Sequence, residues 1–153
     1  MLRRLKGLGA SEDDLLDVYS RQVSSLLELS VPVWQPDLTL QEANQIEGVQ
    51  WCAFYIILGV GYVSHANALD TLVFEDLNTR RIRLCSNFVK KSVKNPRYNN
   101  WFSKNVAVPP PIGTRPGTKK DFTEYQPVRT RTDRFRKSPL PYLTELLNTV
   151  KKQ

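Results

Sequence analysis

The fold is decided by residues 75–95, EDLNTRRIRLCSNFVKKSVKN, a stretch whose apolar and basic residues separate at the period of an α-helix. At about 100° per residue, its apolar side chains fill roughly half of the helix surface and its cations cluster on the other half. Pro96 follows directly and predicts the end of this helix, because the residue before a proline disfavours helical geometry. The basic face comprises Arg80, Arg83, Lys90, Lys91 and Lys94.

This basic face contains no acidic residue among its cations. An ordinary solvated helix face more often pairs lysine or arginine with an acidic residue one turn away. Two interpretations stay open, a solvated surface and a surface that binds a polyanion. Arg81 lies inside the apolar arc, and we expect it either to extend its guanidinium to solvent or to pair with a carboxylate.

Towards the N-terminus, an earlier helix is predicted from Ser11, an N-cap residue followed by three acidic residues in the first turn. Pro32 predicts the end of this helix, and Pro36 extends the break. Residues 1–10 are expected to form a flexible N-terminal segment. The predicted apolar stripe of the helix consists of Leu15, Tyr19, Val23, Leu26 and Leu27.

A second helix is predicted from the capping box Thr39-Leu40-Gln41-Glu42, and Gly59 and Gly61 are well placed to end it. Gly48 lies in its interior, where glycine costs about 1 kcal/mol relative to alanine. A short helix is expected over residues 64–72. The apolar side of the second helix is predicted to comprise Ala43, Ile46, Val49, Ala53 and Ile57.

Beyond Trp101-Phe102 the composition changes, because seven of the ten prolines lie between Val106 and Tyr142. We expect residues 106–137 to form an extended, basic, proline-rich segment, since such a composition cannot build a packed core. Ser138 and Pro139 then predict a short amphipathic helix within residues 138–153. The cations of the basic run in this segment are Arg129, Arg131, Arg134, Arg136 and Lys137. The run fits phosphate binding, an unspecific basic tail or a nuclear-import signal.

The predicted fold class is therefore all-α, an irregular helical bundle over residues 11–105 followed by the extended segment and a docked C-terminal helix. Charge is divided unevenly along the chain. Residues 1–78 contain 4 Lys and Arg against 11 Asp and Glu, whereas residues 79–153 contain 18 against 4. A strongly basic half indicates a polyanionic partner, with nucleic acid as the first candidate and an acidic membrane surface as the second.

Composition also disfavours several classes of protein. No apolar run reaches the roughly 20 residues of a membrane span, and the first residues do not read as a secretory signal. Cys52 and Cys85 are expected to be reduced, buried thiols in an intracellular, nuclear or cytoplasmic protein. His65 is interpreted as a lone surface histidine without Cys or Asp at ligand spacing, so no metal, cofactor or small-molecule substrate is expected. No catalytic motif occurs, and Asp13-Asp14 is explained by helix capping.

A set of short motifs is more specific in combination than any of them alone. Leu15-Leu16 and Tyr19 precede Leu27-Glu28 and the corner Val31-Pro32-Val33-Trp34-Gln35-Pro36, and Ile46-Glu47, Val49-Gln50, Ala53 and Ile56-Ile57-Leu58-Gly59 follow. Further matches are Ala68-Leu69-Asp70-Thr71-Leu72, Arg80-Arg81 with Leu84-Cys85, Lys94-Asn95-Pro96-Arg97 and residues 129–143. In this order and spacing they resemble the segment after the polymerase core of non-LTR (LINE-type, jockey-like) retrotransposon reverse transcriptases. The resemblance covers nearly the whole chain.

The resemblance implies a mostly helical thumb with a C-terminal extension, which holds a template–primer duplex by its backbone. The family's catalytic aspartates, in an aromatic-Ala-Asp-Asp hairpin, do not occur in this sequence, so the resemblance implies no enzymatic activity for this chain. Gly48 and Trp51 stand where the family commonly has basic residues. Two phosphate contacts of the family are therefore missing.

The leading hypothesis is a noncatalytic, nucleic-acid-binding remnant of such an RNA-directed DNA polymerase. Its expected partners are an RNA or DNA duplex, contacted through the backbone, and an upstream polymerase domain of a parent protein, with no membrane partner. One alternative is a protein-interaction module that offers Pro109-Pro110-Pro111 and residues 139–142 as extended docking strands. Another is a decayed reading frame without selected activity.

Overall fold

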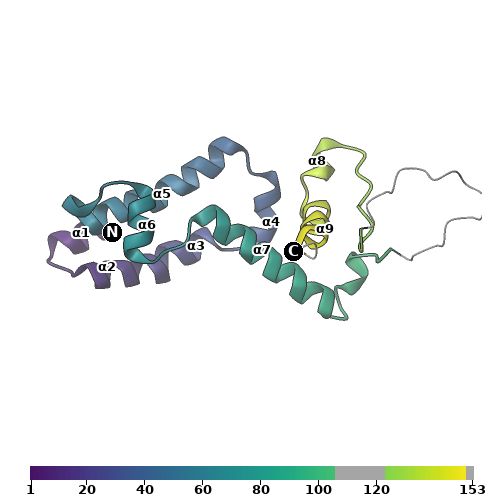
Figure 1. The fold of residues 1–153 in the computed structure, drawn as a ribbon, viewed down its shortest axis with the longest axis horizontal. Coiled ribbons are helices and arrows are strands. Elements are labelled where there is room, and N and C mark those ends of the chain that lie inside the picture. Colours follow the sequence, from purple (N-terminus) through teal and green to yellow (C-terminus); the bar gives the residue numbers. More distant parts are fainter. Residues whose placement is uncertain (106–122, 151–153) are drawn as a thin grey trace, which may run out of the picture. The chain divides into compact units, whose positions relative to one another are not determined.

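The computed structural model describes residues 1–105 and 123–150, and the side chain of Val150 is not among the described parts. Within these residues the regular structure is helical, without a strand and with one isolated antiparallel bridge, so the predicted all-α class is confirmed. The chain divides into two compact units, Met1–Leu84 and Cys85–Gln153 (Figure 1). These units do not coincide with the segments expected from composition, because the division falls inside a helix.

Nine α-helices are described, several of them only one turn long. Six lie in the first unit and two in the second, while α7 contributes residues 77–84 to the first unit and 85–94 to the second. The helices are α1 Leu2–Gly7, α2 Glu12–Val18, α3 Ser25–Leu27, α4 Val31–Trp34, α5 Leu40–Leu58, α6 His65–Leu72, α7 Leu77–Lys94, α8 Asp133–Arg136 and α9 Pro139–Val150.

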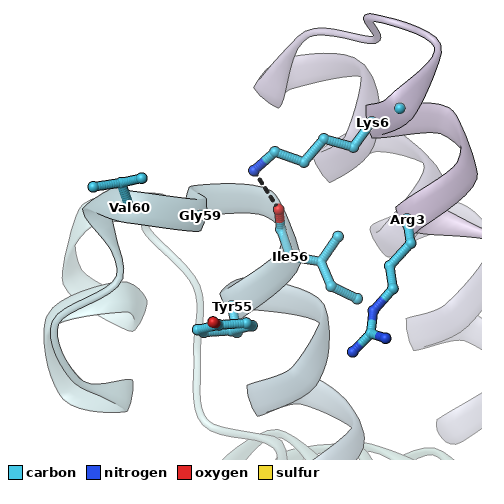
Figure 2. Close-up of a pocket in the computed structure, with 7 residues that line it drawn as sticks. Arg3, Lys6, Tyr55, Ile56, Gly59 and Val60 are labelled. Atoms are coloured by element: carbon cyan, nitrogen blue, oxygen red, sulfur yellow. Dashed lines mark hydrogen bonds between the residues drawn. The ribbon is translucent and has the colours of Figure 1, made fainter.

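Residues 1–10 were expected to form a flexible segment, but they contain the helix α1, and Leu2 is buried in the core. The ammonium group of Lys6 donates to the backbone carbonyl of Ile56 at 2.6 Å (Figure 2), and also to that of Ile57 at 3.0 Å. These carbonyls belong to the last turn of α5, where helix geometry leaves them without a partner inside the helix. Composition alone could not reveal this contact, because it joins residues about fifty positions apart.

The helix that begins at Ser11 starts as predicted but does not keep one α-helical register. The Ser11 hydroxyl accepts from the Asp14 amide at 3.2 Å and the Asp14 carboxylate accepts from the Ser11 amide, which completes a capping box. After α2 the backbone passes through a π-helical segment, Tyr19–Ser24, before α3. The wider turn rotates the following residues, and Leu26, expected on the buried stripe, is 71% exposed.

The corner after this helix is itself helical, which corrects the expected continuous break over residues 31–36. Ser30 adopts the left-handed conformation with a φ of 56° and ends the preceding turns. Pro32 then lies in the first turn of α4, where a proline is tolerated because its missing amide hydrogen would have no partner there. A 3-10 turn, Gln35–Asp37, leads on towards α5.

Helix α5 begins and ends as predicted, and of its predicted apolar side Ala53 and Ile57 are buried, Ala43 and Ile46 are half-buried, and Val49 is the exception. The Thr39 and Glu42 capping box is formed, and Gly59 ends the helix with a φ of 55°. Val49, expected to be buried, is 41% exposed, whereas the polar residues Glu47 and Gln50 are buried. The apolar pattern did not include Glu47 and Gln50 in the buried side, because both residues are polar.

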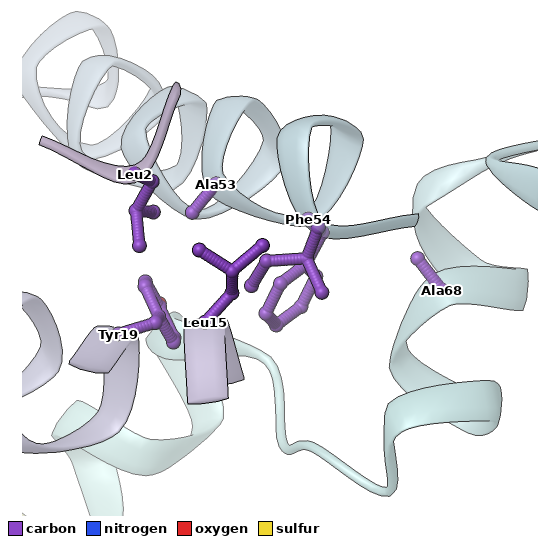
Figure 3. Close-up of a cluster of buried hydrophobic side chains, with 7 residues drawn as sticks. Leu2, Leu15, Tyr19, Ala53, Phe54 and Ala68 are labelled. Carbon is purple, nitrogen blue, oxygen red and sulfur yellow. The ribbon is translucent and has the colours of Figure 1, made fainter. Parts of the chain in front are cut away.

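The core of the first unit gathers side chains from α1, α2, the π-helical segment, α5 and α6 (Figure 3). Tyr19 and Phe54 are completely buried and pack edge to face with ring centroids 5.3 Å apart, and Phe74 packs against both rings. Such edge-to-face pairs add about 0.5–1.5 kcal/mol to the energy of burial alone. The buried members of this cluster are Leu2, Leu15, Tyr19, Ala53, Phe54, Ile57 and Ala68.

In the second unit, residues 103–105 pair with residues 124–126 through the bridge between Lys104 and Tyr125. Asn148 of α9 holds this pairing, because its side-chain amide accepts from the Tyr125 amide and donates to the Tyr125 carbonyl, each at 3.1 Å. Tyr125 is 2% exposed. The apolar side chains buried in this unit include Val89, Phe102, Leu143 and Leu147.

Two expectations for the C-terminal part need correction. The basic run is not extended throughout, since α8 interrupts it and is capped by the Thr132 hydroxyl, which accepts from the Phe135 amide at 3.2 Å. Residues 139–142 form the first turn of α9, with Pro141 buried, so they offer no extended docking strand. The other predicted strand, Pro109-Pro110-Pro111, lies outside the described residues, as does most of the extended segment.

No single described helix has the length and apolar character needed to cross a membrane, although the pair Leu40–Gly61 and His65–Leu72, bent by 81°, meets those criteria jointly. Cys85 is buried as predicted, but Cys52 is exposed on α5, which corrects the expectation of two buried thiols. The two cysteines form no disulfide with each other.

Candidate nucleic-acid interface

Helix α7 separates apolar and basic side chains as the sequence predicts. Asp76 caps its N-terminus, where one carboxylate oxygen accepts from the Thr79 amide at 3.3 Å. Leu77, Cys85 and Val89 are buried on one side. The opposite side presents cations, and their surroundings differ between the two ends of the helix.

The two arginines on the first half of this basic face are already neutralised. Arg80 forms a two-point ion pair with the Glu28 carboxylate, including a hydrogen bond of 3.2 Å from Nη2 to Oε2. Arg83 donates to one oxygen of Glu75 from Nη2, at 2.6 Å, and from Nε, at 3.1 Å. The expectation that this face lacks acidic partners is therefore wrong for Arg80 and Arg83, because the acids come from outside the helix.

The three lysines on the second half of α7 are in a different situation. Lys90, Lys91 and Lys94 are all exposed, and no acidic group of residues 1–105 or 123–150 lies within ion-pairing distance of them. The three lysines lie within little more than one turn of a single helix, so their ammonium groups share one surface. Each is thus available for an anion from outside the described chain.

The second set of predicted cations belongs to the same compact unit, in and around α8. All five side chains are exposed. Arg136 pairs with Asp133 at 2.9 Å, an exposed pair of the kind that contributes little energy. The four cations without an acidic partner among the described residues are Arg129, Arg131, Arg134 and Lys137.

The side chains of this second set have the chemistry that binds a phosphate backbone. Arginine presents a planar fork that can bind a phosphate oxygen pair, and lysine supplies a point charge. Phe135, 42% exposed, stands between Arg134 and Arg136 and offers a ring on which an unpaired base can stack. The second unit therefore presents these four cations and the three lysines of α7, all without an acidic partner among the described residues, and the exposed ring of Phe135 lies within the second set.

A second group of polar residues, which sequence reasoning did not find, lies in the core of the first unit. Arg81 is 1% exposed, and its Nη2 lies 3.2 Å from the carboxylate of Glu47, itself 9% exposed. The prediction that Arg81 would pair with a carboxylate is confirmed. His65 lies nearby, so the interpretation of this residue as a lone surface histidine is wrong.

Burial sets the ionisation of this group. Loss of solvent raises the pKa of Glu47 above its usual range, Asp76 adds to this effect, and Arg81 opposes it. Burial lowers the pKa of His65, against the opposing effect of Asp76. Burial also raises the pKa of the Tyr19 phenol to about 12.

Only one feature of the sequence pointed to this buried polar group. Arg81 is the single cation on the apolar side of its helix, and a cation there needs a partner.

Comparisons of the chain with protein-family models, with curated proteins and with solved structures find no match.

Proposed function

We propose that this protein binds nucleic acid through the phosphate backbone, without catalysis, and that it corresponds to the thumb and C-terminal extension of the reverse transcriptases that it resembles. The observation on which the proposal depends is the set of three exposed lysines on α7, Lys90, Lys91 and Lys94, which have no acidic partner among the described residues. Several cations on one helix face can contact successive phosphates, because a nucleic-acid strand repeats its negative charge along its length.

The second set, around α8, supports the same proposal, because it adds four cations of the same compact unit for which the described residues offer no acidic partner. Phosphate contacts carry no sequence information, so we expect binding with little sequence preference. Arg80 and Arg83 are left out of the proposed interface, since an external phosphate would have to displace a carboxylate from each. This revision makes the contact surface smaller than the five-cation face that the sequence predicts.

The salt dependence of affinity tests the proposal. Each neutralised phosphate of duplex DNA contributes about −0.9 to the slope of log affinity against log salt concentration, so three lysines contribute about −2.7. Replacing Lys90, Lys91 and Lys94 together by glutamine removes these contacts. We expect the slope to become less steep by about 2.7 in fluorescence-anisotropy titrations with an unspecific duplex.

Arg83→Gln is the matched control, because it removes one cation of the same helix that already has a carboxylate partner. We expect this variant to bind with an unchanged slope. Absence of duplex binding at low salt would refute the proposal. It would also fail if the triple lysine variant and Arg83→Gln gave the same slope as the unmodified chain.

A further inference from the structure

The buried polar group of the first unit brings three potential metal ligands together from distant parts of the sequence. Glu47 comes from the middle of α5, His65 is the first residue of α6, and Asp76 directly precedes α7. One ligand atom from each side chain can be chosen so that all three lie within 4.8 Å of one another. The sequence alone gives no metal-ligand spacing, because the nearest two of these residues are eleven positions apart.

Two of these side chains have buried polar atoms whose hydrogen-bonding capacity is not used. Both ring nitrogens of His65 are buried and have no hydrogen-bond partner within the described residues. Neither oxygen of Glu47 accepts a hydrogen bond by the geometry of the described residues. Nη2 of Arg81 lies 3.2 Å from Oε1, and the Asp76 carboxylate is also close to Glu47. Native cores rarely leave such groups unsatisfied, so these atoms point to a further ligand.

The imidazole of His65 is held by its neighbours in a way that suits a metal ligand. Its ring stacks on Phe54, with centroids 6.0 Å apart and planes inclined by 21°, and lies against Trp51 at 5.4 Å. The aromatic walls restrict rotation of the ring and leave its nitrogen-bearing edge for polar groups. A ligand ring fixed by packing loses less entropy when it binds a cation.

We infer that Glu47, His65 and Asp76 form a binding site for a divalent transition-metal cation of the zinc type. One imidazole nitrogen with two carboxylates is a donor set that zinc uses, whereas magnesium and calcium prefer oxygen alone. Ligand bonds of about 2.0–2.2 Å require the three atoms to approach to about 3–4 Å, which small side-chain rotations provide. Three protein ligands leave a fourth tetrahedral position for water.

The charges of the group agree with this assignment. The two carboxylates and Arg81 together give a net charge of −1, so a dication leaves the buried group at +1 instead of accumulating a large charge. The 3.2 Å contact with Arg81 is made by Oε1 of Glu47, and Oε2 is the oxygen that we assign to the cation. Asp76 is oriented by the Thr79 amide, which donates to Oδ2. Arg81 and Thr79 would act as positioning residues, because they hold the ligands without touching the ion.

The test uses the fact that the chain contains a single histidine. In a chain without a histidine tag, the imidazole signals in a proton–nitrogen or proton–carbon spectrum belong to His65 alone. Zinc chloride is titrated into the Cys52→Ser protein, because the exposed Cys52 thiol would bind zinc by itself. We expect the His65 signals to shift and to saturate at one equivalent of zinc.

Asp76→Asn and His65→Ala are the variants, and calorimetry measures their zinc affinity. Asparagine still accepts the hydrogen bond that caps α7, so this change removes charge from the site with little effect on the helix. We expect each variant to weaken zinc binding at least tenfold. The inference is overturned if zinc leaves the His65 signals of the Cys52→Ser protein unmoved, or if Cys52→Ser abolishes all zinc binding. The spectrum of Cys52→Ser decides the question even if a ligand variant fails to fold.

Discussion

The contact between Gly59 and Lys6 allows a quantitative prediction of how much the end of α5 contributes to the stability of the first unit. Gly59 has a φ of 55° and a ψ of −116°, a conformation that is essentially restricted to glycine. A Cβ atom added there would lie 2.7 Å from Nζ of Lys6, which is the atom that caps the end of α5. Gly59→Ala should therefore strain the backbone and displace the lysine at once.

The magnitude follows from these two effects. Backbone strain of this kind costs about 1–3 kcal/mol, and loss of the two hydrogen bonds from an exposed ammonium group costs about 1 kcal/mol. We expect Gly59→Ala to lower the free energy of unfolding by about 2–4 kcal/mol, and Lys6→Met by about 1 kcal/mol. In the Lys6→Met background only the strain remains, so Gly59→Ala should cost about 1 kcal/mol less than in the unmodified chain.

Urea denaturation followed by circular dichroism measures the four proteins of this double-mutant cycle. Gly48→Ala is the matched control, because nothing lies within 4 Å of its added Cβ and the residue is inside α5. This control should gain about 1 kcal/mol of stability. The reasoning is refuted if Gly59→Ala is neutral, or if its cost is the same with and without Lys6.

Three further predictions concern buried charge, a histidine and a helix cap. Arg81→Met should cost about 3 kcal/mol at neutral pH, because it leaves Glu47 buried without its counter-ion. The loss of stability should shrink towards acid pH, because removal of Arg81 raises the pKa of Glu47 further and its protonation then stabilises the folded state. An equal loss at every pH would contradict this explanation. In chelator-treated protein, the nuclear magnetic resonance titration of His65 should have a midpoint below 6.5, and Asp76→Asn should move it lower still, because Asp76 raises this pKa. A midpoint above 6.5 would show that burial does not control the ring. Thr39→Ala should lower the free energy of unfolding by about 1 kcal/mol through loss of the α5 cap, whereas Leu40→Ala, at an exposed neighbouring position, should change it less; equal effects would argue against the cap.

The starts of α2 and α5 and the ends of α5 and α7 could be predicted from the sequence because their signals are local. The N-cap at Ser11, the capping box at Thr39, the glycine at position 59 and the proline at position 96 each act within a few residues. The all-α class and the basic side of α7 follow from periodicity, which is also a local property. These are the parts of the fold that agree with expectation.

The partners of Arg80 and Arg81 could not be predicted, because they depend on contacts across the fold. Arg80 meets Glu28, fifty-two positions away, and Arg81 meets Glu47 on another helix. The buried side of α5 was predicted incompletely for the same reason, since Glu47 resembles a surface residue until its partner is known. The π-helical turn that exposes Leu26 has no recognised signal in this sequence. Of the five cations predicted on the basic face of α7, the three lysines therefore remain in the proposed interface, and Arg80 and Arg83 are excluded from it.

The two thiols of this protein differ sharply in their exposure to solvent, and this difference allows the rate of local opening to be measured. Cys52 is exposed on α5, whereas Cys85 opens the second compact unit with no solvent-accessible surface at all. A maleimide added to the native chain reacts with the outer sulfur at once, and reaches the inner one only when the surrounding helices separate. The delay between the two modifications, read by mass spectrometry, reports how often that part of the molecule opens without any label having been engineered into it.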